Sequence, residues 1–361
     1  MKQSLLEYLE CPETGQDLSL EVFYQKEEEI NGKRFKEIYE GLLKTRDGKF
    51  IYPIINGIPR LLPISLQLEL RRYHKEFFRK YKAFFPIQMN SENSDILNDS
   101  KRTLKSYSYQ WRTFDEMLKE WKRYFDDYMK PFRPTFFKGK KVLDIGCGYG
   151  RIAYYSAKYG AEVFAMDLSE AVESAYKNTR AFSNCHIVQG SIYHIPFKKK
   201  FDLIYCVGVI QHTPKKEDSF RKLVEKMGKG TLLYIWVYSR RRGIYNLIYP
   251  MRKFTTKMPF KLLKIVCFSC AVLQSVLILL PYKLMILSNI KPLKRLAKKI
   301  PYTTYAYYPF RYNYADWFDR LSVPLTDGFS KEQVENWFRK ADLKEIIITP
   351  RTTGWRGVGR R

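Results

Sequence analysis

The feature that most constrains the fold is a glycine-rich turn between an apolar strand and a helix, Val142-Leu143-Asp144-Ile145-Gly146-Cys147-Gly148-Tyr149-Gly150. Glycine has no Cβ, so this turn can be tight and a ligand can approach the backbone N–H groups closely. A dinucleotide-binding loop has its third glycine one residue later. Asp144 lies directly before the turn, where it would repel a pyrophosphate and attract an amino group. The turn therefore predicts a nucleoside-binding site for a ligand that carries a cationic group.

Apolar runs and amphipathic segments alternate after this turn. Strands are expected over residues 141–145, 161–166, 186–189, 201–208 and 231–238, and helices over 150–159, 170–181 and 214–227. Such alternation is typical of an α/β fold with a parallel, doubly wound, Rossmann-like sheet. It resumes later, with a helix over 330–341 and strands over 345–349 and 355–358. Ser330 followed by Gln333 is the pattern of a helix capping box.

An acidic residue follows the second expected strand. This residue is Asp167, 17 positions after Gly150. Ligands of parallel sheets bind beyond the carboxyl ends of the strands, so Asp167 is placed to accept hydrogen bonds from both hydroxyls of a ribose. The turn and this carboxylate together predict a nucleoside at that edge of the sheet.

These motifs resemble those of class I S-adenosylmethionine-dependent methyltransferases, over residues 140–238 and 330–361. The resemblance implies S-adenosylmethionine as the cofactor. It places Gly146, Gly148 and Gly150 beside the methionine part of the cofactor and Asp144 near the amino group. It also implies that Asp167 holds the ribose and that Leu168 packs beside the adenine. The other residues expected to line this site follow the third strand or end the fourth: Ser191, Ile192 and Val207.

Methyl transfer from a sulfonium is an in-line displacement, and a base is needed only where the acceptor must lose a proton, as a hydroxyl does. His212 is the candidate base, because it follows the fourth strand at the ligand-binding edge and titrates near neutral pH. Its segment, Gly208 to Pro214, resembles the motif that follows the fourth strand in the family. The alternative is a histidine that caps the helix over 214–227 or shapes the pocket. His194, after the third strand, is a weaker candidate.

Residues 1–65 read as a small β-rich module, with strands over 18–25 and 34–45 around Asn31-Gly32. Cys11-Pro12-Glu13-Thr14 resembles the start of a zinc-ribbon-like domain that precedes many bacterial methyltransferases. That domain has two Cys-x-x-Cys pairs, and the matching residues here are Cys11, Thr14, Thr45 and Gly48. Zinc needs about four ligands, so we expect no metal in this module.

The rest of the chain divides into four further expected segments. Residues 66–135 are a helical linker and cofactor cover, with a helix over 66–85, a polar loop over 88–106 and the aromatic segment Tyr107–Trp111. Residues 136–239 are the S-adenosylmethionine-binding core. Residues 240–315 are a basic, apolar helical insertion, and residues 316–361 hold the last helix and strands of the sheet.

The insertion concentrates the charge of the chain. The whole sequence carries a net charge of +27, and residues 240–315 contain 15 Lys and Arg and no Asp or Glu. They also contain the most apolar run, Ile265–Leu280, whose 16 residues we expect to end at Pro281, short of the roughly 20 that a membrane span requires. Three interpretations stay open: an anionic membrane surface bound through residues 240–300, a lid over the substrate pocket, or an RNA-binding surface. The apolar run disfavours RNA, because leucine and valine have no partner on phosphate.

The sequence as a whole predicts an enzyme. The expected reaction is methyl transfer from S-adenosylmethionine to an oxygen of a small or lipid-linked acceptor. The alternatives are an RNA methyltransferase, suggested by the charge, and a non-catalytic cofactor-binding module. The segment Met1–Glu10 has no apolar stretch typical of a signal peptide, so the expected location is cytoplasmic, with peripheral contact at the inner face of the membrane.

Overall fold

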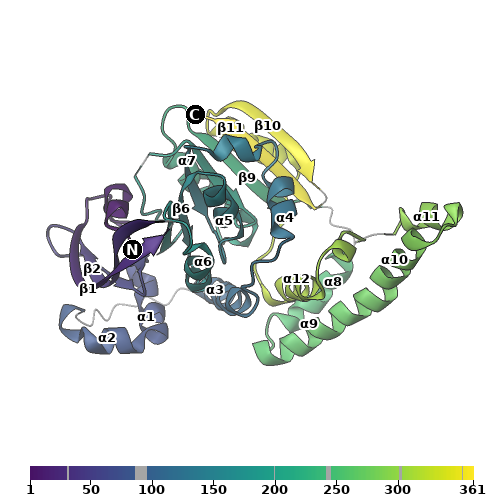
Figure 1. Ribbon diagram of the computed structural model, residues 1–361, viewed down its shortest axis with the longest axis horizontal. Coiled ribbons are helices and arrows are strands. Elements are labelled where there is room, and N and C mark those ends of the chain that lie inside the picture. Colours follow the sequence, from purple (N-terminus) through teal and green to yellow (C-terminus); the bar gives the residue numbers. More distant parts are fainter. Residues whose placement is uncertain (31, 86–95, 199, 241–244, 301–302, 352) are drawn as a thin grey trace.

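The computed structural model describes residues 1–30, 32–85, 96–198, 200–240, 245–300, 303–351 and 353–361 (Figure 1). The predicted turn residue Asn31, the first part of the predicted loop over 88–106, and the insertion cations Arg241 and Arg242 lie outside the described residues. In the described part, a central sheet separates a small N-terminal β region from a helical region that extends to the other side.

The centre of the molecule is a parallel sheet of five buried strands. They are β5 (Lys141–Ile145), β6 (Glu162–Asp167), β7 (Cys185–Gly190), β8 (Leu203–Val207) and β9 (Leu232–Tyr238). Their spatial order is β7-β6-β5-β8-β9, with every neighbouring pair parallel. The strand order reverses beside β5, which places a ligand crevice at the carboxyl end of that strand. The predicted α/β, Rossmann-like fold is confirmed.

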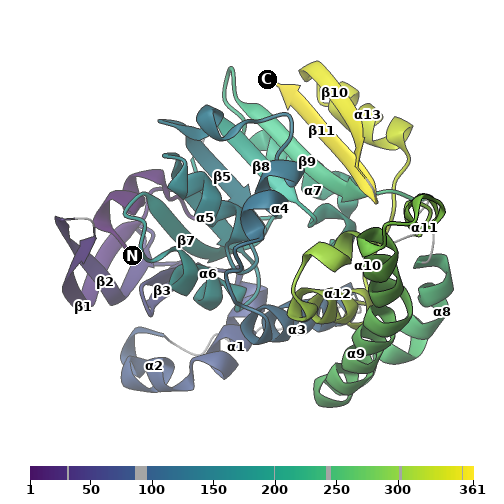
Figure 2. The same cartoon turned by 45° about the vertical axis from the view of Figure 1, so that its right-hand side comes forward.

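Helices cover this sheet where the alternating pattern predicts them. They are α5 (Arg151–Lys158), α6 (Ala171–Thr179), α7 (Lys216–Glu225) and α13 (Lys331–Lys340). The predicted capping box is present, since the backbone N–H of Gln333 donates to the Ser330 hydroxyl and the Gln333 side-chain oxygen accepts from the backbone N–H of Ser330. Antiparallel β10 (Lys344–Arg351) and β11 (Gly354–Arg360) complete this edge of the sheet beside β9 (Figure 2).

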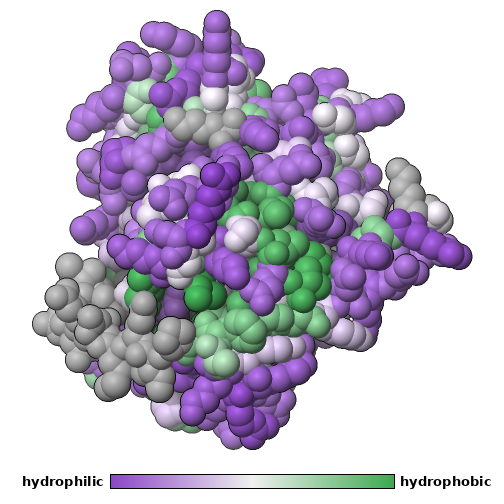
Figure 3. Space-filling model, turned by 90° about the vertical axis from the view of Figure 1, so that its left-hand side faces the viewer, coloured by the Kyte–Doolittle hydropathy of each residue, from purple (hydrophilic) through white to green (hydrophobic). Residues whose placement is uncertain are grey.

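The N-terminal β region continues the central sheet. Its strands are β1 (Ser19–Ile30), β2 (Lys33–Lys44), β3 (Ile51–Ile55) and β4 (Ile58–Leu61), after the 3₁₀ helix η1 (Gln3–Tyr8). β4 pairs in parallel with β7, so one sheet of eleven strands runs from β1 to β10. On the side of the molecule that carries this region, an apolar patch lies within a largely hydrophilic surface (Figure 3). The Cys11 thiol is buried, 3.4 Å from the Tyr52 hydroxyl, and the Thr45 hydroxyl donates to Asp47.

The segment before β5 is more helical than its polarity suggests. The predicted helix over 66–85 is divided at His74 into α1 (Ile64–Tyr73), α2 (Lys75–Lys80) and η2 (Lys82–Phe84). The prediction of a loop through residue 106 is wrong, because α3 spans Ile96–Thr113. Two serines of its polar face have buried partners: the Ser106 hydroxyl donates to the Ser322 hydroxyl, and the Glu170 backbone N–H donates to the Ser108 hydroxyl. Two shorter elements follow, α4 (Trp121–Tyr128) and η3 (Pro134–Phe137).

The insertion is helical, and part of it projects from the sheet. Its elements are α8 (Tyr245–Thr255), α9 (Phe260–Gln274), the π-helical turn η5 (Ser275–Leu279), α10 (Leu280–Leu287), α11 (Lys291–Ala297), η6 (Thr303–Tyr307) and α12 (Phe310–Ser322). We call α9 to α11 the arm, because they extend away from the sheet as one elongated body (Figure 1).

Pro281 does not end the apolar helix, contrary to the prediction. Proline lacks an N–H and clashes with the preceding turn in a regular helix interior. Here a π-helical turn precedes it, Pro281 falls in the first turn of α10, and the helix runs continuously over Phe260–Leu287. Among the described residues this helix, 28 residues long, is the one with the length and composition to cross a membrane, and 28% of its most apolar window is buried.

Candidate active site

A cavity of about 810 Å³ opens at the carboxyl ends of β5, β6 and β8. Its wall includes most of the residues predicted for cofactor binding: Asp144, Gly146, Gly148, Asp167, Leu168, Ser191, Ile192 and Val207. The candidate bases His212 and His194 also line it. Because these residues come from different strands and the loops after them, the sheet topology brings them together.

The glycine turn adopts a backbone conformation that favours glycine. Gly146 and Gly148 have φ angles of 81° and 55°, in the region where a side chain is strained. A Cβ on Gly146 would lie 2.2 Å from a methyl group of Val209, and a Cβ on Gly148 would meet the indole of Trp111 at 3.5 Å. Gly150 differs, because it is outside the cavity wall and faces α6, where a Cβ would lie 3.2 Å from the Cα of Ala175.

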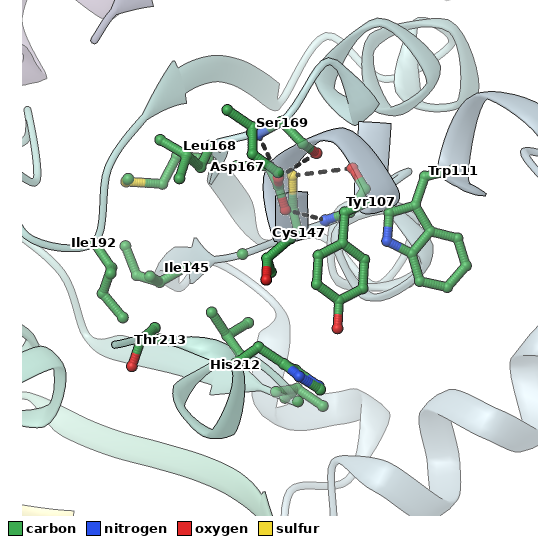
Figure 4. Close-up of a pocket in the computed structure, with 18 of the residues that line it drawn as sticks. Tyr107, Trp111, Ile145, Cys147, Asp167, Leu168, Ser169, Ile192, His212 and Thr213 are labelled. Carbon is green, nitrogen blue, oxygen red and sulfur yellow. Dashed lines mark hydrogen bonds between the residues drawn. The ribbon is translucent and has the colours of Figure 1, made fainter. Parts of the chain in front are cut away.

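Asp167 is held in one orientation at the end of β6. One of its carboxylate oxygens accepts from the backbone N–H of Gly148 at 2.9 Å, and the other accepts from the N–H and hydroxyl of Ser169 at 2.8 and 2.7 Å (Figure 4). Burial raises the pKa of Asp167, while these hydrogen bonds oppose the rise. Because Oδ1 accepts two hydrogen bonds and Oδ2 accepts one, Oδ2 retains a lone pair and can still accept from a hydroxyl of a ribose.

Asp144 lies beneath the turn with unsatisfied hydrogen-bonding capacity. The residue is 2% exposed, and its Oδ2 has no hydrogen-bond partner among the described residues. Burial raises the pKa of this carboxyl well above its usual range. A buried acceptor without a partner destabilises the protein, so a cationic donor in the adjacent cavity would be favoured there. The unpaired oxygen of Asp144 and the glycine turn together fit S-adenosylmethionine.

The remaining predicted residues line the same cavity. In the close-up, Leu168 and Ile192 lie on one side of the open space and Tyr107 and Trp111 on the other (Figure 4). The Ser191 hydroxyl accepts from the backbone N–H of Tyr193 at 3.2 Å, so it also keeps its proton available to a ligand. These apolar and aromatic walls suit a flat ring such as adenine.

His212 lies at the side of the cavity away from Asp167. Its Nδ1 is 2.8 Å from the carbonyl oxygen of Leu325 and 3.0 Å from the hydroxyl of Thr326. Its ring packs edge to face between Tyr107 and Tyr238, at centroid distances of 5.4 and 5.5 Å. An Nδ1–H that donates to a carbonyl leaves the lone pair of a neutral ring on Nε2. These contacts therefore orient the ring from the loop between α12 and α13.

Sequence reasoning missed a second polar group in the same cavity, formed by Gln110 of α3, Tyr238 at the end of β9 and Asp319 of α12. The Tyr238 hydroxyl donates to Asp319 at 3.4 Å. Burial, reinforced by the neighbouring carboxylate of Asp316, raises the pKa of Asp319 to about 6. Tyr238 and Asp319 lie 81 positions apart and Gln110 is farther still, so nothing local in the sequence relates the three.

Arg151, at the start of α5, also lines the cavity. Its guanidinium carbon lies 4.5 Å from the ring centroid of Tyr124, 4.8 Å from that of Trp121 and 5.1 Å from that of Tyr149. Cation–π contacts of this kind hold a guanidinium without neutralising it. The side chain therefore supplies positive charge in the wall of the cavity.

Comparisons with known proteins agree with this geometry. Residues 143–235 match the methyltransferase domain family. The ubiquinone biosynthesis O-methyltransferase of Schizosaccharomyces pombe is 33% identical over 29% of this chain and 40% of its own, and that of Coxiella burnetii is 31% identical over 30% and 47%. A solved structure of a putative O-methyltransferase from Nostoc punctiforme is 14% identical, with a TM-score of 0.41, over 74% of this chain and 69% of its own. The predicted resemblance to class I S-adenosylmethionine-dependent methyltransferases is confirmed for the core.

The similarity is confined to part of the molecule. This chain spans less than half the length of the first two relatives, and the family match ends at residue 235. The insertion and the region before β5 lie outside the family match, so the identity of the acceptor has to be argued from the structure.

Proposed function

We propose that this chain, whose residues 143–235 form a methyltransferase domain, transfers a methyl group from S-adenosylmethionine to an oxygen of a small or lipid-linked acceptor. The observation that carries the proposal is the meeting of three features at one edge of the sheet. They are the glycine cradle, the unsatisfied carboxylate of Asp144 and the oriented carboxylate of Asp167. The relatives named above are O-methyltransferases, which supports an oxygen as the acceptor atom.

The chain's own residues would bind the cofactor and remove the proton of the acceptor. S-adenosylmethionine supplies an electrophilic methyl group when it is bound. Asp167 would hold the ribose and Asp144 would attract the amino group. His212 would accept the proton of the acceptor hydroxyl at Nε2, while Nδ1–H donates to the Leu325 carbonyl and keeps the ring in place. The aromatic walls exclude water, which strengthens these electrostatic contacts.

Calorimetric titration with S-adenosylmethionine and S-adenosylhomocysteine tests the cofactor site directly. We expect both to bind the wild-type protein and Asp167→Ala to abolish binding, because the variant loses the ribose partner and the acceptor of the Gly148 N–H. Glu335→Ala, which removes a half-buried acid on α13 that pairs with the exposed Arg339, is the control and should bind as the wild type does. Unchanged affinity in Asp167→Ala would refute the site.

A kinetic measurement tests whether His212 is the base. His212→Gln should lower kcat by about 100-fold or more and leave the affinity for S-adenosylhomocysteine within twofold of wild type, because a general base acts in the chemical step. An acceptor is found by mass-spectrometric screening for methylated product, with RNA included in the screen. Methylated RNA as the product would establish the RNA alternative, and cofactor binding without any product would favour the non-catalytic one.

We also propose that the arm binds an anionic lipid surface, placing the enzyme in the cytoplasm at the inner face of a membrane. The exposed large apolar side chains of the arm form a long series: Leu262, Ile265, Phe268, Val272, Leu273, Val276, Leu277, Leu280, Leu284, Leu287, Ile290 and Leu296. Leu277 and Leu287 are 68% and 79% exposed. Lys and Arg flank this series, and residues 240–315 contain no acid. Apolar surface rimmed by cations is typical of helices that lie in a lipid interface.

The contacts of α9 favour an arm that lies on the membrane over one that crosses it. The other face of α9 packs on α12, where the Trp317 indole N–H donates to Gln274 at 2.7 Å. On α12, Arg320 pairs with Asp316. A charged pair of this kind inside the hydrocarbon region is costly, so α12 would stay on the aqueous side with the catalytic core.

A further inference from the structure

The segment between α3 and α4, residues 114–120, belongs to no helix or strand, and we call it the entrance loop. Three alternate residues of this loop line the cavity: Phe114, Glu116 and Leu118. Such alternation is expected of an extended segment, whose successive side chains point to opposite sides. Asp115 is outside the cavity wall, and its carboxylate pairs with the exposed Lys177 of α6 at 3.1 Å. The entrance loop therefore has one side in the cavity and the other toward α6.

Helix α12, at the end of the insertion, forms the part of the cavity wall beside this loop. Its residues in the wall are Arg311, Tyr312, Ala315, Asp316 and Asp319. Arg311 pairs with the carboxylate of Glu116 in the entrance loop, at 2.7 Å. Its guanidinium also donates to the backbone carbonyl of Thr113 at 2.8 Å and lies 5.4 Å from the ring centroid of Phe114. A single side chain thus joins α12 to the entrance loop.

The ion pair of Arg311 and Glu116 lies at the rim of the cavity. Both side chains line the cavity, yet they are 43% and 52% exposed to solvent. A side chain that lines a cavity and is also about half exposed lies where the cavity meets solvent. An ion pair in such a position contributes little free energy and is screened by salt. The pair can therefore break and form again without loss of the fold.

Aromatic contacts connect this rim to the glycine turn. The indole of Trp111 lies over Gly148, where a Cβ would be 3.5 Å away. The ring of Tyr149 is 5.1 Å from that of Trp111 and 6.4 Å from that of Trp121. Trp121 in turn lies 5.2 Å from Tyr312, the residue that follows the cation of the pair. Since all of these residues line the cavity, the rim and the glycine turn belong to the same end of it.

We propose that the entrance loop and α12 form a gate over the cofactor site, and that the pair of Arg311 and Glu116 is its latch. The inference rests on the proposed methyl transfer, since S-adenosylmethionine and S-adenosylhomocysteine are the ligands that would pass the gate. While the latch is closed, the walls exclude water from the reacting sulfonium. A latch that does not touch the ligand favours neither the bound nor the free protein. It slows entry and release equally and leaves the affinity unchanged.

Stopped-flow tryptophan fluorescence of the full chain with S-adenosylhomocysteine measures both rates, because tryptophans line the cavity. We expect Arg311→Ala and Glu116→Ala each to raise the rate constants of entry and of release by about threefold to tenfold. The dissociation constant from calorimetry should stay within about twofold of that of the wild type. Lys122→Ala is the control, because it breaks an exposed pair of the same length, 2.7 Å, with Asp126 on α4. Neither residue of this pair lines the cavity, so the control should exchange the ligand as the wild type does.

Salt provides a second readout of the latch. S-adenosylhomocysteine has no net charge at neutral pH, so salt does not change its attraction to the protein. Raising sodium chloride from about 50 to about 500 mM should speed exchange in the wild type, because screening weakens the pair. The same change should leave the rates of Arg311→Ala and Glu116→Ala unaltered.

The outcomes separate this inference from the proposed function. Wild-type rates in both variants would show that the pair is not a latch. A loss of affinity through one rate constant alone would show that the two residues belong to the binding site itself. Either result would overturn the gate and leave the methyl transfer standing. If the wild type does not bind S-adenosylhomocysteine, the proposed function itself is wrong.

Discussion

The catalytic core and the arm are both rich in apolar residues, but they use them in opposite ways. The strands β5 to β9 are buried almost throughout, and Phe164, Tyr205 and Tyr234 are fully inaccessible. The arm instead leaves one face of its longest helix exposed, and most of the net charge of the chain lies in the same insertion. In the core, shape is set by packing around a ligand. In the arm, apolar side chains are left exposed beside cations, and it is the apolar part of this surface that water does not stabilise.

The comparison shows that the apolar content of a segment does not by itself indicate whether the segment supports a site or binds a partner. Soluble monomers rarely expose long apolar faces, so an exposed face of this kind indicates an interaction. A buried strand, by contrast, supports a site without touching its ligand. The two regions should therefore respond differently to the same kind of substitution, and variants can be chosen to break or sharpen the contrast.

The largest expected effect is in the glycine turn. Gly146→Ala should weaken S-adenosylhomocysteine binding by about 100-fold or more, or roughly 3 kcal/mol, because the new Cβ overlaps Val209 in the wall of the site. Gly230→Ala is the matched control. Gly230 has the same φ of 81°, but a Cβ there would meet nothing within 4 Å, so it separates backbone strain from steric overlap. Calorimetry should show wild-type affinity for the control, and equal losses in both variants would mean that strain alone accounts for the effect.

The core could be predicted because its determinants are local. The glycine spacing, the alternating runs and Asp167 all lie within one stretch of sequence, and each indicates a geometry by itself. The polar group formed by Gln110, Tyr238 and Asp319 could not be predicted, because these residues come together only when α3, β9 and α12 enclose the same cavity. Pro281 shows a second limit of prediction from the sequence. A proline usually ends a helix, and only the π-helical turn before it lets the helix continue.

The role of Arg60 could not be predicted either, because its partners are distant in the sequence and meet it only in the folded protein. It looks like a surface residue of a β-rich module, yet it is fully buried where β4 meets β7 and pairs with Glu170 and Glu173 of the core. His74 and Gln189 also contact Glu170, at 3.0 Å each. Gln189 in turn donates to the backbone carbonyl of Leu168 at 3.1 Å. The N-terminal region is thereby joined to the loop after β6, where Leu168 lines the cavity.

A second prediction tests how far the interior charge of the core stabilises it. His74, Arg60 and Gln189 more than offset the burial of Glu170 and lower its pKa from 4.5 to about 2. Because the pKa is lower in the folded state, the ionised group stabilises the protein above pH 4.5, and this stabilisation is lost as the pH falls toward 2. Glu170→Gln should therefore lower the free energy of unfolding by about 3 kcal/mol at pH 7 and by much less at pH 3.

Urea denaturation at the two pH values measures this difference. Glu335→Gln, in an exposed pair with Arg339, is the control and should change stability by less than about 0.5 kcal/mol at either pH. A pH-independent loss in Glu170→Gln would show that shape, and not charge, is what the network provides.

The smallest expected effect concerns the arm, and it distinguishes the two regions most directly. Leu277→Glu combined with Leu284→Glu should weaken binding to vesicles of anionic lipid by about tenfold, because each substitution places a carboxylate at an exposed apolar position among cations. Flotation measures it, with zwitterionic vesicles and RNA as the competing surfaces. Ile347→Glu, at an exposed isoleucine of β10, makes the same chemical change away from the arm and should bind lipid normally. Both proteins should retain wild-type affinity for S-adenosylhomocysteine. Release by high salt would agree with an arm that lies on the surface, whereas retention through alkaline carbonate extraction would show that the helix over Phe260–Leu287 crosses the membrane.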